Sequence, residues 1–128
     1  MNFKFCYFKF PDSESLNATI CPNNIEDNKG DLIASYLVDN GGASLESHIE
    51  YLKECSTHLE NPLTCEADIS SNSYGADICS NKVKICFLYN EDEDVEVNRL
   101  ELKEVMDAWI LFLEKEPVEG YEETINIV

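Results

Sequence analysis

The apolar pattern of residues 98–113 constrains the fold more than any other stretch of the sequence. Asn98, followed three residues later by Glu101, resembles a capping box and predicts that a helix begins here. Pro117 is expected to close the helix. Its apolar positions are Leu102, Val105, Met106, Trp109, Ile110, Phe112 and Leu113. Other elements must cover so wide an apolar face, and Trp109 in the middle of it is expected in the core rather than in an interface.

Two further helices are predicted upstream of this one. Ser44 is placed as the N-cap of a helix that ends at Asn61 and Pro62. The apolar stripe of that helix is Leu45, Ile49, Leu52, Cys55 and Leu59. A shorter helix over residues 31–39 stops at Asn40, Gly41 and Gly42. Each presents one apolar face, as a helix that packs on a sheet does.

Alternation of apolar and polar residues predicts the strands. They are expected over residues 3–10, 16–21, 64–70, 77–79 and 82–89, with an edge strand in the tail that contains Ile125, Ile127 and Val128. Two of these strands, over residues 64–70 and 82–89, are expected to bury one face each: Cys65, Ala67 and Ile69 in the first, and Val83, Ile85, Phe87 and Tyr89 in the second. Strands and helices interleave without regular βαβ alternation. The sequence therefore predicts a single α+β domain over residues 1–128, an antiparallel-rich sheet packed against two or three amphipathic helices.

The charge of the chain restricts its partners. Asp and Glu number 26 against 9 Lys and Arg, a formal net charge of −17. Nucleic acid and anionic membranes are poor direct ligands for such a surface, because phosphates are bound by Lys and Arg. Solubility needs a net charge of only about 2–8 in magnitude, so the surplus favours a basic partner. It is densest at residues 91–96 and 114–123.

The N-terminal residues and the cysteines indicate where the protein acts. Residues 1–10 alternate apolar and polar side chains before Pro11, which is unlike a signal peptide, and no run reaches the ~20 apolar residues of a membrane helix. A cytoplasmic protein is expected. Its six cysteines are then read as small buried side chains, Cys65, Cys79 and Cys86 on sheet faces, with disulfides and a metal site left open as alternatives. No cofactor is expected.

Two alternatives concern residues 90–101 and the histidines. Asn90 to Glu101 match the spacing of an EF-hand calcium loop, but Val95 stands where the loop needs Gly and a strand leads into it. A strand-to-helix turn with acids near the helix N-terminus is the simpler interpretation. His48 and His58 have no nucleophile or second acid-base group in a recognisable motif, so an enzyme is not expected.

Two segments carry a resemblance to a known class of protein. Residues 83–90, Val-Lys-Ile-Cys-Phe-Leu-Tyr-Asn, run into Glu-Leu-Lys-Glu-Val-Met-Asp-Ala-Trp-Ile-Leu-Phe-Leu at 101–113. In a short, very acidic α+β chain this resembles the bacterial immunity proteins of polymorphic toxin systems, in particular those of contact-dependent growth inhibition. The resemblance implies a cytoplasmic protein that binds one cognate toxin domain, often a nuclease, and blocks its active site or substrate surface.

The expected binding surface lies in the second half of the chain. The residues expected to pair with Lys and Arg of the toxin are Glu91, Asp92, Glu93, Asp94 and Glu96, together with Glu66 and Asp68 on the wet face of an adjacent strand. The first hypothesis is an immunity protein that covers a basic nuclease. The second is a DNA mimic or anti-restriction protein, and the third a calcium-responsive module.

Overall fold

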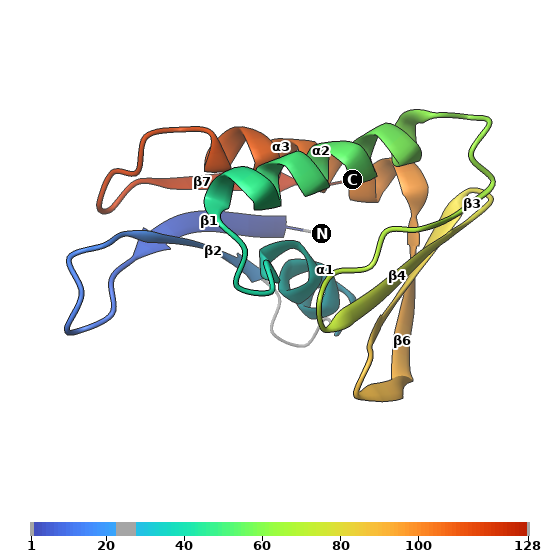
Figure 1. The fold of residues 1–128 in the computed structure, drawn as a ribbon, viewed down its shortest axis with the longest axis horizontal. Coiled ribbons are helices and arrows are strands. Elements are labelled where there is room, and N and C mark those ends of the chain that lie inside the picture. The colour runs from blue at the N-terminus through green and yellow to red at the C-terminus, as the bar shows by residue number, and fades with distance from the viewer. Residues whose placement is uncertain (1, 23–27, 128) are drawn as a thin grey trace.

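Two antiparallel sheets and three helices make up the part of the chain described by the computed structural model, residues 2–22 and 28–127, with the backbone alone at Pro22 and Glu91. The elements are β1 (Asn2–Phe8), β2 (Asn17–Pro22), α1 (Asn28–Val38), α2 (Leu45–Glu60), β3 (Glu66–Asp68), β4 (Tyr74–Cys79), β5 (Lys82–Phe87), β6 (Asn90–Asn98), α3 (Arg99–Leu113) and β7 (Glu122–Asn126). Sheet A has the order β2-β1-β7, and sheet B the order β3-β4-β5-β6 (Figure 1). The predicted α+β class is confirmed, with two sheets in place of one.

Sheet A packs against α3 through aromatic side chains. Phe5 lies on β1 with its ring centroid 5.2 Å from that of Trp109 and 5.5 Å from that of Phe112. All seven predicted apolar positions of α3 are buried, and Asn98 caps the helix by accepting hydrogen bonds from the backbone N–H groups of Leu100 and Glu101. The prediction made for this helix is therefore confirmed, including Trp109 in the core.

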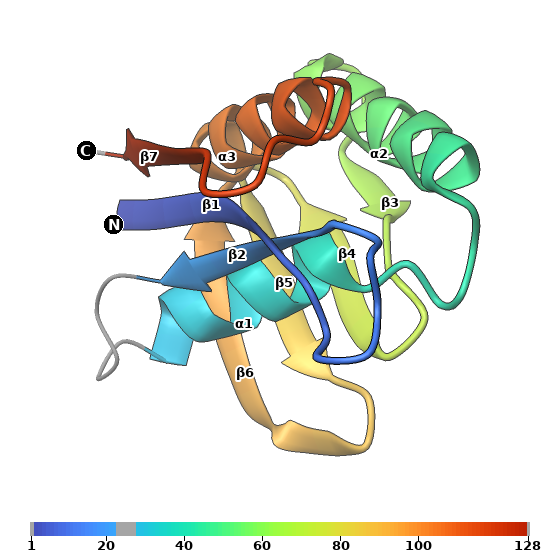
Figure 2. The same cartoon turned by 90° about the vertical axis from the view of Figure 1, so that its left-hand side faces the viewer.

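Helix α1 joins the two sheets into one core. It packs against β1 and β2 of sheet A and against β5 and β6 of sheet B, and Figure 2 shows it between them. At its C-terminal end the Leu37 carbonyl accepts a hydrogen bond from the Trp109 indole at 3.1 Å, which fixes α1 to α3. The inner face of sheet B contributes Ala76, Ile78, Val83, Ile85 and Val97 to the same core.

Several sequence predictions needed correction. Strand β3 has three residues rather than seven, and Cys65 before it is exposed. Tyr89, expected on the inner face, is 80% exposed, because β5 ends at Phe87 and the chain turns there. Leu45, expected in the apolar stripe of α2, is 53% exposed at the first position of that helix. The predicted boundary at Ser44 is confirmed, since its side chain accepts from the backbone N–H of Ser47. Val128 lies outside the described residues.

The cysteines are mostly not buried. All six are thiols; Cys55 is buried, Cys6 and Cys86 are half-buried, and Cys21, Cys65 and Cys79 are exposed. Cys79 pairs in register with Glu66 and Lys82, so it lies on a sheet face that no helix covers. The prediction of buried thiols was wrong for the exposed three: Cys79 lies on the uncovered face of sheet B, Cys65 precedes β3, and Cys21 lies on β2 of sheet A opposite Lys4.

Candidate protein-binding surface

The acidic run after residue 90 is a strand, and the prediction of a strand-to-helix turn was wrong. Residues 90–98 form β6, which is paired antiparallel with β5. The register passes from Cys86 opposite Asp94 to Phe87 opposite Asn90, so β6 carries an irregularity over residues 91–93. A strand sends successive side chains to opposite faces, which differs from the closed ligand loop of an EF-hand. Within residues 2–22 and 28–127, no three His, Cys, Asp or Glu side chains are grouped to hold a metal ion.

The outer face of sheet B gathers carboxylates from three strands. The sequence placed Glu66 and Asp68 on a strand adjacent to β6, but β3 and β6 are the opposite edges of the sheet. The register nevertheless aligns Asp68 with Asp77, then Lys84 and then Glu96 across all four strands. We call this outer surface the acidic face; its charged residues are Glu66, Asp68, Asp77, Lys82, Lys84, Asp94 and Glu96, all exposed. The acidic face therefore carries five carboxylates and two amines.

Local contacts favour the charged forms of two groups on the acidic face, Lys84 and Asp68. Lys84 Nζ lies 3.2 Å from Asp94 Oδ2, and this hydrogen-bonded ion pair raises the pKa of Lys84. The Ser70 hydroxyl and backbone N–H donate to Asp68, which lowers the pKa of that carboxyl. The first contact favours the charged ammonium of Lys84 and the second the charged carboxylate of Asp68.

A cluster of aromatic side chains lies at one end of sheet B beside the acidic run. The ring centroids of Tyr74 and Phe87 are 5.3 Å apart, and those of Phe87 and Tyr89 are 5.4 Å apart. We call Tyr74, Phe87 and Tyr89 the aromatic tip; the β5–β6 hairpin that carries two of them extends past α1 (Figure 2). The exposed Asp92 and Glu93 stand three and four residues after Tyr89 in the sequence. Tyr74 and Phe87 are half-buried and Tyr89 is exposed, and an exposed ring next to carboxylates suits contact with Arg and Lys side chains.

Arg99 holds the acidic face in place, a role that the sequence analysis did not identify. Its guanidinium is buried and donates five hydrogen bonds, all to backbone carbonyls. The acceptors are His58, Leu59 and Asn61 at the end of α2, Thr64 before β3, and Ser80 between β4 and β5, at 2.6–2.9 Å. A cation at the C-terminal end of α2 is favourable for the helix dipole. The one available signal was a cation at the first position of α3, where a cation is unfavourable for that helix.

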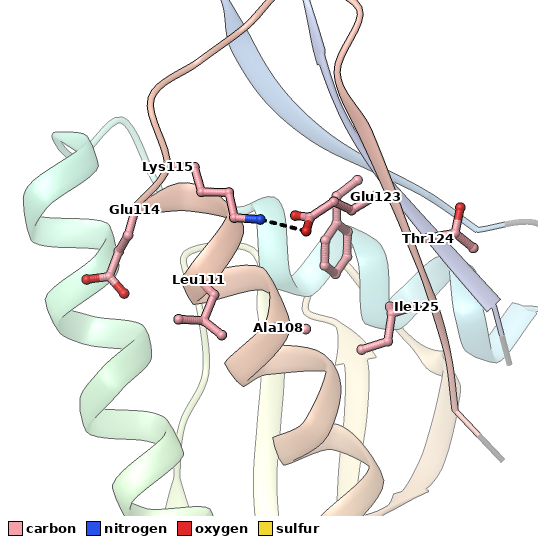
Figure 3. A pocket seen from close by; sticks show the side chains of 8 residues that line it. Ala108, Leu111, Glu114, Lys115, Glu123, Thr124 and Ile125 are labelled. Atoms are coloured by element: carbon pink, nitrogen blue, oxygen red, sulfur yellow. Dashed lines mark hydrogen bonds and ion pairs between the residues drawn. The ribbon is translucent and has the colours of Figure 1, made fainter.

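A second surface lies between α3 and β7. Figure 3 shows a groove of about 480 Å³ lined by Phe5, Ala108, Leu111 and Ile125, with polar groups at its rim. Lys115 Nζ lies 2.7 Å from Glu123 Oε1 across the mouth, and Lys53 Nζ lies 3.0 Å from Glu114 Oε2 beside it. The carboxylates at this rim are thus matched by lysines, unlike those of the acidic face.

His48 has a structural contact. It is buried, and its Nε2 lies 3.1 Å from the Leu37 carbonyl, so this nitrogen carries the proton and donates. Burial lowers the pKa of His48, which favours the neutral ring. A hollow of about 210 Å³ that also contacts Tyr7 and Trp109 lies beside it. These contacts fix the ends of α1 and α2 together.

Comparison with known sequences places the chain in a family. Residues 1–127 match the Family of unknown function (DUF5376), and the chain belongs to this family. Among curated proteins it is similar to the Uncharacterized protein PM0491 of Pasteurella multocida (strain Pm70), with 28% identity over 97 residues, 73% of this chain and 75% of the relative. No solved structure matches the chain significantly. In the described part of the chain, no helix is both long and apolar enough to cross a membrane.

Proposed function

We propose that this protein is an immunity protein that acts in the cytoplasm, where it binds and neutralises a cognate toxin domain with a basic surface. One observation carries the proposal: the register of sheet B brings five carboxylates from β3, β4 and β6 onto one uncovered face beside two lysines. The resemblance of residues 83–90 and 101–113 to immunity proteins points to the same class of partner.

The surplus charge of the acidic face supports capture of a cationic protein. Carboxylates without a compensating lysine create a negative potential that raises the rate at which a basic partner arrives, to roughly 10⁸–10⁹ M⁻¹s⁻¹ in favourable cases. Ion pairs already formed within a surface contribute little to this potential. On the acidic face Lys84 pairs with Asp94, and four other carboxylates have no ion pair with a lysine: Glu66, Asp68, Asp77 and Glu96.

The aromatic tip supplies the apolar contact that such a complex needs. Binding energy in protein interfaces is concentrated in a few residues, among which Tyr is enriched. Tyr89 is the most exposed ring of the aromatic tip and lies two residues after the end of β5, the strand that carries Lys82 and Lys84. We expect the carboxylates to direct the approach of the partner and Tyr89 to anchor it.

A nuclease fits this partner chemistry best. Its active cleft must attract phosphates and therefore carries Lys and Arg. An acidic protein placed over that cleft occupies the surface that RNA or DNA would take. The protein itself binds stoichiometrically and needs no cofactor for this role.

The test is binding and inhibition with the domain encoded immediately upstream of this chain. We expect a stoichiometric complex at low micromolar concentration and loss of the domain's activity. A matched experiment uses the triple variant Glu66→Gln, Asp77→Asn and Glu96→Gln. This variant should bind the upstream domain more weakly, and its loss of affinity should be largest at low salt. Absence of both binding and inhibition by the natural protein would falsify the proposal.

A DNA mimic or anti-restriction protein is the second candidate. The observation that favours it is the regular spacing of the acidic face, since alternate residues such as Asp94 and Glu96 are about 6.6 Å apart along a strand. A mimic should bind several unrelated DNA-binding proteins, whereas an immunity protein should bind one. Titration against a small panel of DNA-binding enzymes separates the two.

A further inference from the structure

We propose that a cationic β-strand of the partner protein adds to the free edge of β6 and becomes a fifth strand of sheet B. The inference deepens the proposed function and rests on it only in taking the partner to be a basic protein. It begins from the place of β6 in the sheet. Residues 94–98 pair with β5 on one side, and on the other side β6 pairs with no strand of residues 2–22 and 28–127. A strand edge of this kind offers backbone hydrogen-bonding groups to an added strand.

The side chains of β6 alternate in chemistry as well as in direction. Asp94 and Glu96 are exposed on the acidic face. Val95 and Val97 point to the other face, where Val97 is buried and Val95 packs half-buried against the core. A strand added here would need cationic residues on the outer face and apolar residues on the inner face to match its neighbour.

Strand β5, which pairs with β6 inside the sheet, already alternates cationic residues on the outer face with apolar residues on the inner face. Lys82 and Lys84 lie on the outer face, and Val83 and Ile85 are buried on the inner face. Lys84 lies opposite Glu96 in register and makes its ion pair with Asp94. The free edge of β6 presents the same carboxylates to its other side, so a partner strand that alternates Lys or Arg with apolar residues would repeat the contacts of β5.

The same carboxylates, Asp94 and Glu96, oppose pairing of β6 with β6 of a second copy of this chain. Two β6 strands paired antiparallel about Val95 would place Asp94 of one opposite Glu96 of the other, and like charges directly opposite are destabilising. Each copy also carries a net charge of −17, which opposes association over longer distances. The edge therefore rejects its own copy and admits a basic strand.

Short synthetic peptides test this strand addition without the natural partner. The first is Lys-Val-Lys-Ile-Lys-Val-Lys, capped at both ends; the second has N-methylated backbone nitrogens at alternate residues, and the third replaces Lys by Glu. Binding is followed by the amide NMR signals and hydrogen exchange of the ¹⁵N-labelled protein at millimolar peptide. We expect the first peptide to shift the amide signals of residues 93–97 and to slow their exchange. The N-methylated and the Glu peptides should not.

Two charge-reversal variants separate strand addition from general electrostatic attraction. Glu96→Lys and Asp77→Lys each change the charge by the same amount in the same cross-strand row, but Asp77 lies on the inner strand β4. Glu96→Lys should weaken binding of the first peptide about tenfold, and Asp77→Lys should weaken it much less. Variants that fold are recognised by unchanged amide signals in sheet A.

Three results would overturn the inference: no binding of the first peptide at millimolar concentration, equal binding of its N-methylated form, or equal effects of the two variants. Signal changes at β7 or self-association through β6 would do the same. None of these results bears on whether the upstream domain is bound. Conversely, if the first peptide adds to β6 but the upstream domain is not bound, the proposed function is wrong and the inference about the edge of β6 is still supported.

Discussion

Sheets A and B differ in how many of their surface carboxylates form ion pairs with lysines. Around sheet A, Lys4 lies 3.2 Å from Glu122, Lys9 lies 3.2 Å from Glu119, and Lys115 lies 2.7 Å from Glu123. On the acidic face of sheet B the one ion pair among the described residues is that of Lys84 with Asp94. The acidic face, with five carboxylates and two lysines, contributes −3 to the net charge of −17, so its distinguishing feature is the arrangement of its carboxylates and not their share of the total. We therefore propose the acidic face, on the ground of this arrangement, as the surface that binds a basic partner.

The largest expected effect concerns the attachment of sheet B to the rest of the molecule. Arg99→Met should lower the free energy of unfolding by about 3–5 kcal/mol, because five backbone carbonyls, most of them only partly buried, lose a charged donor. Arg99→Lys should recover only part of this, since an ammonium group cannot reach five acceptors. Urea unfolding measures both. A loss below about 1 kcal/mol for Arg99→Met would show that sheet B is held by its apolar contacts alone.

The second prediction compares one aromatic side chain from each region. Tyr89→Ala should weaken binding of the upstream domain by about 2 kcal/mol, roughly thirtyfold, as expected for an interface anchor. Tyr121→Ala, which removes the ring stacked on Phe112 beside sheet A, is the matched control and should leave the affinity unchanged. Isothermal titration calorimetry gives both values. An equal loss in the two variants would remove the aromatic tip from the interface.

The third prediction concerns the junction between the two regions, where His48 and Trp109 both donate to the Leu37 carbonyl. Burial lowers the pKa of His48 in the folded chain, so the unfolded chain takes up a proton first as the pH falls below about 6.5. The stability that His48 contributes is therefore complete above that pH and decreases as the pH falls through it. The slope is at most about 1.4 kcal/mol per pH unit. The free energy of unfolding of the natural chain, measured against His48→Gln from pH 7 to 5, should show this decrease, and a constant difference would contradict it.

The smallest effects are expected from removing single surface lysines. Lys84→Gln and Lys115→Gln should leave stability unchanged within error, because each lysine is exposed. Their effects on binding should differ. Lys84→Gln makes the acidic face more negative and should speed association with the upstream domain a few-fold at low salt, whereas Lys115→Gln should not. Equal association rates in stopped-flow experiments would mean that the two regions contribute alike.

Local patterns predicted much of this fold. The caps at Ser44 and Asn98 and the apolar face of α3 depend on neighbouring residues, and they were found where expected. The position of β3 and the exposure of Cys65 depend on strand order and on which sheet face stays uncovered, and local spacing does not contain that information. The acidic residues of the candidate site could be named from composition. Their gathering on one face required the register across four strands, and the role of Arg99 required knowing where the carbonyls of α2 end.

The central claim is that the uncompensated carboxylates of sheet B, and not negative charge in general, bind the partner. It is tested most directly by comparing two triple variants that remove the same number of charges. One is Glu66→Gln, Asp77→Asn and Glu96→Gln on the acidic face, and the other is Glu119→Gln, Glu122→Gln and Glu123→Gln beside sheet A. We predict that the first weakens binding of the upstream domain about thirtyfold at low salt and that the second leaves the affinity within threefold of the natural protein. Equal weakening, or a larger effect of the second variant, would contradict the claim.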